Sequence, residues 1–210
     1  MNKTKITNMI SEYCTFEKGL VYTLILLPRK KENSQQVERE KLQKRVRFLV
    51  ANMDDVNSAL DEYDRYAKLY PEIVFRIYIS VNRRSLLKAM REFQRRLMDI
   101  QYDLLNGNEQ AWTSVERLGS EWKSTLAKKP CREDRFFHYD IDLSNSDPKE
   151  VAIVKNFVHD IKEFTEVKYF GESKNGFALV VFPFNPNLIK LPEGIEMTDD
   201  GYLYVDCLNG

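Results

Sequence analysis

The alternation of apolar and polar positions divides the chain into strands and amphipathic helices. Short, nearly continuous apolar runs predict strands, and these runs are 20–27, 73–81, 136–143, 166–170, 177–182 and 202–205. Apolar residues spaced three and four apart predict helices with one buried face. That spacing recurs over 56–69, 86–104, where Met90 is on the predicted buried face, 112–122 and 151–161. Asp54-Asp55 is the candidate cap of the first helix. Asp147, Pro148 at the first helical position and Glu150 form a capping-box-like start for the last.

The order of these elements predicts an α+β fold, a mainly antiparallel sheet with flanking helices. No repeat or low-complexity linker divides the chain, so residues 1–210 are predicted to form a single domain. Residues 106–135 look like a helical insertion, and the charge-rich stretch 29–47 looks like a loop that leads into a helix.

The strand 136–143 has carboxylates where a buried strand would have apolar residues. Side chains alternate between faces, so one face carries Phe137, Tyr139, Ile141 and Leu143, and the other carries His138, Asp140 and Asp142. Residues two apart lie about 6.5–7 Å from each other along a strand, so Asp140 and Asp142 can converge on one divalent ion or on a pair of ions. The alternative is a solvated strand face, with His138 as a packed, hydrogen-bonded histidine.

Two further stretches carry candidate chemistry. In the turn 171–176, backbone N–H groups near Ser173 and Gly176 can cradle a phosphate, with charge from Lys174; the alternative is a plain Asn-Gly hairpin. The acidic turn 198–201 offers a third carboxylate. The candidates are Asp200, Asp199 and Asp206, in that order, although an Asp-Asp-Gly turn explains two of these acids without a function.

The net charge of the whole chain indicates no particular partner, but basic residues cluster locally. Lysine plus arginine number 32, and so do aspartate plus glutamate. From Arg83 to Arg96, however, six basic residues stand against one acid, a balance of +5. Arg83 and Arg84 are therefore candidates for contact with a phosphate backbone, and a solvated helix face is the alternative.

The cysteines and the apolar runs limit the cellular setting. Cys14, Cys131 and Cys207 lie far apart without a Cys-x-x-Cys, which disfavours a zinc module or a disulfide framework. No apolar run approaches the ~20 residues that span a bilayer, and residues 1–11 lack the apolar core of a signal peptide. We therefore expect a soluble, cytoplasmic protein without a membrane partner.

Taken in order, these motifs resemble those of the archaeo-eukaryotic primase superfamily, especially its small stand-alone members from bacteriophages. Asp140-Ile141-Asp142 is similar to the first motif, Ser173-Lys174-Asn175-Gly176-Phe177-Ala178 to the second, and Asp200 or a neighbour to the third. The segments 76–85 and 183–185 add to the likeness, which runs from about 46 to 206.

The resemblance implies a primase/RRM-like catalytic core and a nucleotidyltransferase that uses Mg²⁺ or Mn²⁺ and nucleoside triphosphates in DNA replication. Asp140, Asp142 and Asp200 would be catalytic, with the metal on the first two. Ser173, Lys174, Gly176 and Ala178 would contact the nucleotide. Single-stranded DNA or RNA and other phage or host replication proteins would be partners, in the host cytoplasm if the chain is phage-encoded.

The sequence departs from the family pattern at Ala178, where the superfamily has a histidine that contacts the triphosphate. Losing such a charge-assisted contact costs roughly 1.5–3 kcal/mol. Two interpretations follow. The chain is either a weakened primase-polymerase or a catalytically inactive nucleotide- or nucleic-acid-binding protein with a regulatory or sequestering role.

Overall fold

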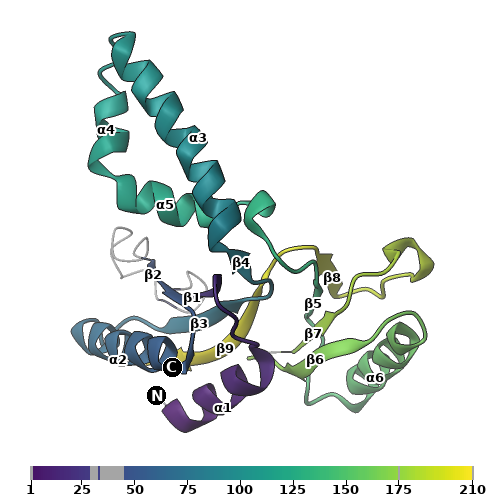
Figure 1. Cartoon of the computed structure of the whole chain (residues 1–210). Coiled ribbons are helices and arrows are strands. Elements are labelled where there is room, and N and C mark those ends of the chain that lie inside the picture. Colours follow the sequence, from purple (N-terminus) through teal and green to yellow (C-terminus); the bar gives the residue numbers. More distant parts are fainter. Residues whose placement is uncertain (1, 29–32, 34–44, 175, 210) are drawn as a thin grey trace.

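The strands form two antiparallel sheets that lie side by side (Figure 1). The computed structural model describes residues 2–28, 33, 45–174 and 176–209. The first sheet has the order β2-β1-β3-β9, with β4 also paired to β1; its strands are β1 (Leu20–Pro28), β2 (Val46–Val50), β3 (Phe75–Ser80), β4 (Arg84–Ser85) and β9 (Tyr202–Leu208). The second has the order β6-β7-β5-β8; its strands are β5 (Phe137–Ile141), β6 (Val167–Glu172), β7 (Phe177–Val181) and β8 (Ile195–Thr198).

The α+β class is confirmed, but the strands divide between two sheets instead of joining one. The chain builds most of the first sheet, then the second, and returns to the first with β9. Each sheet has its own covering helices, but the larger apolar cluster extends from the first sheet to Ala178 and Val180 of β7, and a second cluster lies under the other face of the second sheet. The single-domain assignment stays a prediction.

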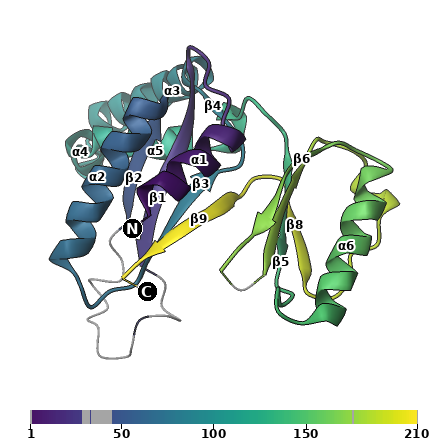
Figure 2. The ribbon, with the colours of Figure 1, turned by 90° about the horizontal axis from the view of Figure 1, so that it is seen from below.

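The first sheet buries one face under α1 (Lys3–Tyr13) and α2 (Met53–Leu69), as Figure 2 shows from below. The N-cap of α2 is Asn52, whose side chain accepts a hydrogen bond from the Asp55 backbone N–H. The helix therefore starts slightly before the predicted Asp54-Asp55 cap. Neither α1 nor the short strands β2, β4 and β8 were predicted.

The second sheet packs its apolar face against α6 (Pro148–Lys162). This helix starts as expected, with Pro148 at its first position and the Asp147 side chain accepting from Lys149 N at 2.9 Å. Glu150 accepts from Ser144 N, a contact outside the predicted capping box. Tyr139 and Ile141 are fully buried beneath α6, so β5 turns its apolar face inward, as its alternation predicts.

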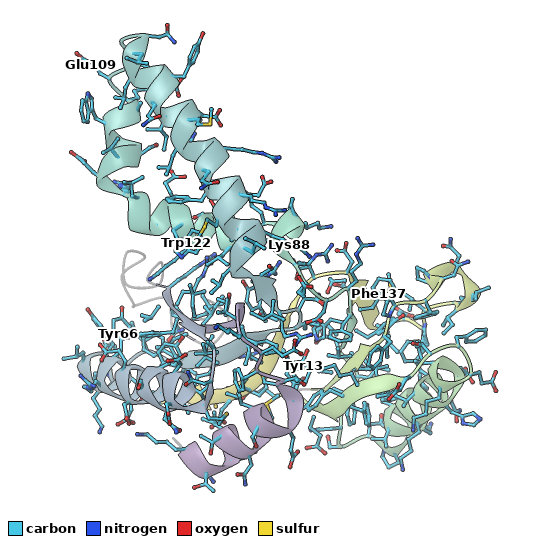
Figure 3. All side chains as sticks on the ribbon, in the orientation of Figure 1. Tyr13, Tyr66, Lys88, Glu109, Trp122 and Phe137 are labelled. Atoms are coloured by element: carbon cyan, nitrogen blue, oxygen red, sulfur yellow. The ribbon has the colours of Figure 1, made fainter. Side chains whose placement is uncertain are left out.

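A helical arm, residues 86–131, projects away from both sheets (Figure 1). It comprises α3 (Leu86–Leu105), α4 (Ala111–Glu116), α5 (Leu118–Leu126) and the 3-10 turn η2 (Lys129–Cys131). Two short helices thus occupy the region where one was expected. The rings of Phe93 and Trp122, the latter labelled in Figure 3, lie 5.4 Å apart and hold α3 against α5. Met90, predicted on the buried face, is 53% exposed.

The predicted loop and helix over 29–47 fall mostly outside the described residues, and Val46 and Arg47 belong to β2. Among the described segments, no helix combines the length and apolarity needed to cross a membrane.

Candidate functional site

Asp140 and Asp142 are exposed on the face of β5 that turns away from α6. Asp140 lies opposite Ala178 in β7 and opposite Glu196 in β8. Residues directly opposite in an antiparallel pair share a face. The β5 carboxylates, the Ala178 methyl group and the Glu196 carboxylate therefore occupy one surface.

The Asp140 and Asp142 side chains line a narrow pocket of about 70 Å³ between the two sheets. The second sheet contributes one wall. The other wall comes from β3 and β9 of the first sheet and consists of Arg76, Tyr78, Tyr202 and Tyr204.

We call these four residues the Arg-Tyr wall, and three of them, Arg76, Tyr78 and Tyr204, are in contact across the β3–β9 pair. The rings of Tyr78 and Tyr204 lie 6.0 Å apart in an edge-to-face arrangement. The Arg76 guanidinium lies over the Tyr204 ring, 5.7 Å from its centre. A cation and aromatic rings thus face the carboxylates across the pocket, a combination suited to a ligand with phosphates and a base.

Two further pockets continue this surface in opposite directions. A pocket of about 250 Å³ shares Tyr78 and Tyr202 and extends along the first sheet to Arg45 and Arg47. A pocket of about 350 Å³ shares Asp140 and Asp142 and continues past four further residues and two acids, Glu193 and Glu196. The groove that results, which we call the inter-sheet groove, is basic and aromatic at one end and acidic at the other.

His138 shares the carboxylate face but lies deeper, with 7% of its surface exposed. Burial lowers the pKa of its imidazole to about 4, so the ring is neutral at pH 7. The backbone of Gly201 passes so close that a Cβ there would lie 2.9 Å from His138 Nδ1. His138 is thus a packed side chain, the alternative favoured by the sequence.

The turn 173–176 closes a hairpin between β6 and β7, in which Ser173 N donates to Gly176 O at 2.9 Å. The turn sits directly on the end of β5, because a Cβ at Gly176 would lie 2.1 Å from the carbonyl oxygen of Ile141. This close approach brings Ser173 into the pocket of the aspartates. Lys174 is exposed on the same turn.

The structure does not bring Asp200 to this pocket. Both of its carboxylate oxygens accept hydrogen bonds from Arg84 Nη2 at 2.8 Å, and only 12% of the side chain is exposed. Asp199 pairs with Lys129 at 2.9 Å. Asp206 lies on β9 opposite Ile77 and does not line the pocket either.

Arg83 and Arg84 join the arm to the two sheets. Arg83 binds both oxygens of Asp134, at 2.8 and 2.9 Å, and Glu17 at 2.6 Å. Arg84 is 3% exposed and holds Asp200. Their positive charge is neutralised within the fold, so the predicted phosphate contacts do not match their placement.

Positive charge is more accessible nearby, in a pocket of about 670 Å³ at the root of the arm. Its cations are Lys88, Lys129, Arg132 and Arg135. Lys88 pairs with Glu133 at 2.9 Å. Arg135 is exposed and forms no ion pair with the described part of the chain. This root pocket therefore offers more accessible positive charge than Arg83 and Arg84 do.

The Arg-Tyr wall and Glu196 were not predicted from the sequence. A usable signal existed for the wall, because polar or aromatic residues alternate with aliphatic ones over 76–80 and 202–205. Such alternation indicates a strand with one open face. No comparable signal marked Glu196, since the four-residue strand β8 lacks an apolar run.

The carboxylates fit a divalent cation on the chemistry of their donors. Within the described residues, no group of three or more His, Cys, Asp or Glu side chains converges on a metal position. Mg²⁺, however, is commonly bound through one or two carboxylates plus substrate phosphates. Asp140 and Asp142 supply such a pair, and Glu196 is the next carboxylate in register.

Comparison with family models, curated proteins and solved structures yields no match to this chain.

Proposed function

We propose that this protein is a divalent-metal-dependent nucleotidyltransferase of primase type that acts on nucleoside triphosphates. The observation that carries the proposal is the placement of Asp140 and Asp142 opposite the Arg-Tyr wall, with the turn 173–176 seated at the end of β5. Its setting would be the cytoplasm, or the host cytoplasm for a phage protein.

In this proposal Asp140 and Asp142 hold Mg²⁺ or Mn²⁺, with Glu196 beside them. The bound ion supplies positive charge to the triphosphate and lowers the pKa of an attacking hydroxyl group. Ser173 and the backbone near Gly176 position the triphosphate, and Lys174 adds charge. Tyr78 and Tyr202 offer ring faces to a base, since stacking on aromatic side chains is tolerant of sequence.

A single-stranded DNA or RNA partner would be held by the root pocket. Four cations against two acids, Glu133 and Asp199, leave it net positive. Arg135 is the residue we expect to matter most for a strand. This assignment replaces the role expected for Arg83 and Arg84, whose charges are neutralised by Asp134 and Asp200.

Titration calorimetry of ATP and GTP with Mn²⁺ tests the carboxylate site. The variant Asp140→Asn/Asp142→Asn should lose metal-dependent binding. The matched control Asp160→Asn/Glu163→Gln changes two exposed acids at the α6 end and should bind like the unaltered protein. Equal binding by the two variants, or none by the unaltered protein, would contradict the proposal.

Ala178 favours a second candidate function, nucleotide or nucleic-acid binding without turnover in a regulatory or sequestering role. Its methyl group lies opposite Asp140, where it offers no hydrogen-bond donor to a triphosphate. Primer synthesis on a single-stranded template should separate the two functions. Product from Ala178→His but not from the unaltered protein supports a weakened enzyme, whereas nucleotide binding without product from either supports the binding role.

A further inference from the structure

The chain passes between the two sheets twice. The first connection, residues 132–136, leads from the helical arm into β5, and the second, residues 199–201, leads from β8 into β9. The second connection runs beside the end of β3, where Val81 N donates to Gly201 O at 2.9 Å. The residue after Val81 contacts both connections.

That residue is Asn82, whose side chain is completely buried. Its Oδ1 accepts a hydrogen bond from Phe136 N at 2.8 Å. Its Nδ2 lies 3.3 Å from Phe136 O, 3.4 Å from Asp199 O and 3.5 Å from Asp200 Oδ1. One amide group thus ties the first connection and the second connection to the end of β3.

The second connection also lies directly against the second sheet. A Cβ at Gly201 would lie 2.9 Å from both His138 Nδ1 and Thr198 Oγ1. His138 belongs to β5, the strand that carries the two aspartates. The absence of a side chain at Gly201 therefore lets the entry to β9 approach β5 closely.

We call Asn82, Phe136 and residues 199–201 the inter-sheet joint, because both walls of the inter-sheet groove begin there. Asp140 comes four residues after Phe136, and Tyr78 comes four residues before Asn82. At about 3.3 Å per residue, each lies about 13 Å from the joint. A rotation of about 10° at the joint would change the spacing between these two side chains by about 2 Å.

Apolar contacts also link the sheets, since Ala178 and Val180 of β7 belong to the larger apolar cluster. Apolar attraction is non-directional, so it holds the sheets together without fixing the angle between them. Hydrogen bonds weaken as they depart from linearity, so the Asn82 amide restricts that angle. We propose that Asn82 is a positioning residue that sets the width of the inter-sheet groove. Only its consequence for nucleotide binding rests on the proposed function.

A distance measurement between two nitroxide labels, by double electron–electron resonance, tests the joint. A ketone-bearing amino acid at Arg65 on α2 and at Lys155 on α6, both exposed, carries the labels without use of the native cysteines. Asn82→Leu has a similar shape but no amide, and it should broaden or shift the distance distribution by about 2 Å or more. Tyr63→Phe removes a buried hydroxyl that bonds only to β1 and β2, and it should leave the distribution unchanged.

Gly201→Ala tests the same joint without removing a hydrogen bond, and it decides the matter if Asn82→Leu does not fold. The added methyl group must displace His138, so the mean distance should shift. Gly119→Ala meets no atom within 4 Å and should not shift it. A variant at Asn82 or Gly201 that is folded by circular dichroism, yet has the distance distribution of the unaltered protein, would overturn the proposal.

Titration of ATP with Mn²⁺ on the same variants connects the joint to the ligand site. Asn82→Leu should weaken binding by about tenfold or more, because a displacement of about 1 Å misplaces groups that act together. Tyr63→Phe should bind like the unaltered protein. Unweakened binding by Asn82→Leu would overturn the positioning role. If the unaltered protein binds no nucleotide, the proposed function fails, whereas the distance measurement still decides whether Asn82 sets the groove.

Discussion

The two acidic sites of this chain look alike in sequence but have opposite environments in the fold. Asp140 and Asp142 are exposed to an open groove. Asp200 is almost enclosed, with both oxygens bound to Arg84. Asp140 and Asp142 thus lie where a ligand can reach them, while Asp200 ties Arg84 of β4 to the turn between β8 and β9. Burial, and not the residue type, separates an accessible carboxylate from a structural one.

Removing the Asp200 charge should have the largest effect on stability. Asp200→Asn leaves the buried Arg84 guanidinium without its counter-charge, and breaking such a pair costs about 3–5 kcal/mol. Urea denaturation measures this loss. Asp199→Asn is the matched control, since its carboxylate is 47% exposed and its pair with Lys129 is worth about 1 kcal/mol or less. Similar losses in both variants would show that Asp200 is not the structural acid.

Lowering the pH should destabilise the protein through His138, the buried neighbour of the aspartates. Burial holds its folded pKa at about 4, against about 6.5 in the unfolded chain. Below about pH 6.5 His138 becomes protonated in the unfolded chain, whereas in the folded protein it stays neutral until the pH approaches 4. Stability therefore falls between about pH 6.5 and pH 4, by about 3 kcal/mol in total.

Denaturation at a series of pH values should show that slope, and His138→Gln should flatten it. The only other histidine, His159, is exposed on α6, and His159→Gln should retain the slope. A slope that survives in His138→Gln would assign the pH dependence to other groups.

Adding one methyl group at Gly176 should produce a smaller loss. A Cβ there would overlap the Ile141 carbonyl, so Gly176→Ala must displace the turn from β5. We expect a loss of roughly 1–3 kcal/mol and weaker nucleotide binding, both measurable on one preparation. Gly119→Ala on α5 meets no atom within 4 Å and should be neutral or slightly stabilising. Unchanged nucleotide binding by Gly176→Ala would show that the turn 173–176 is not part of the ligand site.

Substitution of Asp140 and Asp142 should have the smallest effect on stability and the largest effect on ligand binding. Asp140→Asn/Asp142→Asn changes two exposed side chains, whose interactions are weakened by solvent, and should change the free energy of unfolding by about 1 kcal/mol or less. Metal-dependent nucleotide binding should nevertheless disappear. A large destabilisation would mean that this pair, like Asp200, serves the fold.

How much of the structure the sequence reveals depends on how local the determinants are. The face of β5 that carries the aspartates follows from alternation within one strand, and the start of α6 follows from Asp147 and Pro148. Both are local signals, and both were predicted.

The features that the sequence did not predict depend on contacts between distant segments of the chain. The division into two sheets, the pairing of Arg84 with Asp200 across 116 residues, and the position of Glu196 beside Asp140 arise only when strands meet. Arg83 and Arg84 read as a basic patch, because the acids that neutralise them lie elsewhere in the chain. Met90 is exposed because α4 and α5 cover only part of the apolar surface of α3.

The late position of β9 has a consequence for synthesis on the ribosome. β9 pairs with β3, and Tyr204 lies opposite a tyrosine made more than a hundred residues earlier. Until β9 emerges, the nascent chain can complete the second sheet and expose its aspartates, yet it lacks Tyr202, Tyr204 and the partner of Arg84. A partly synthesised chain therefore lacks one wall of the inter-sheet groove. A ligand that fills the groove can bind and stabilise only chains that have been synthesised through β9.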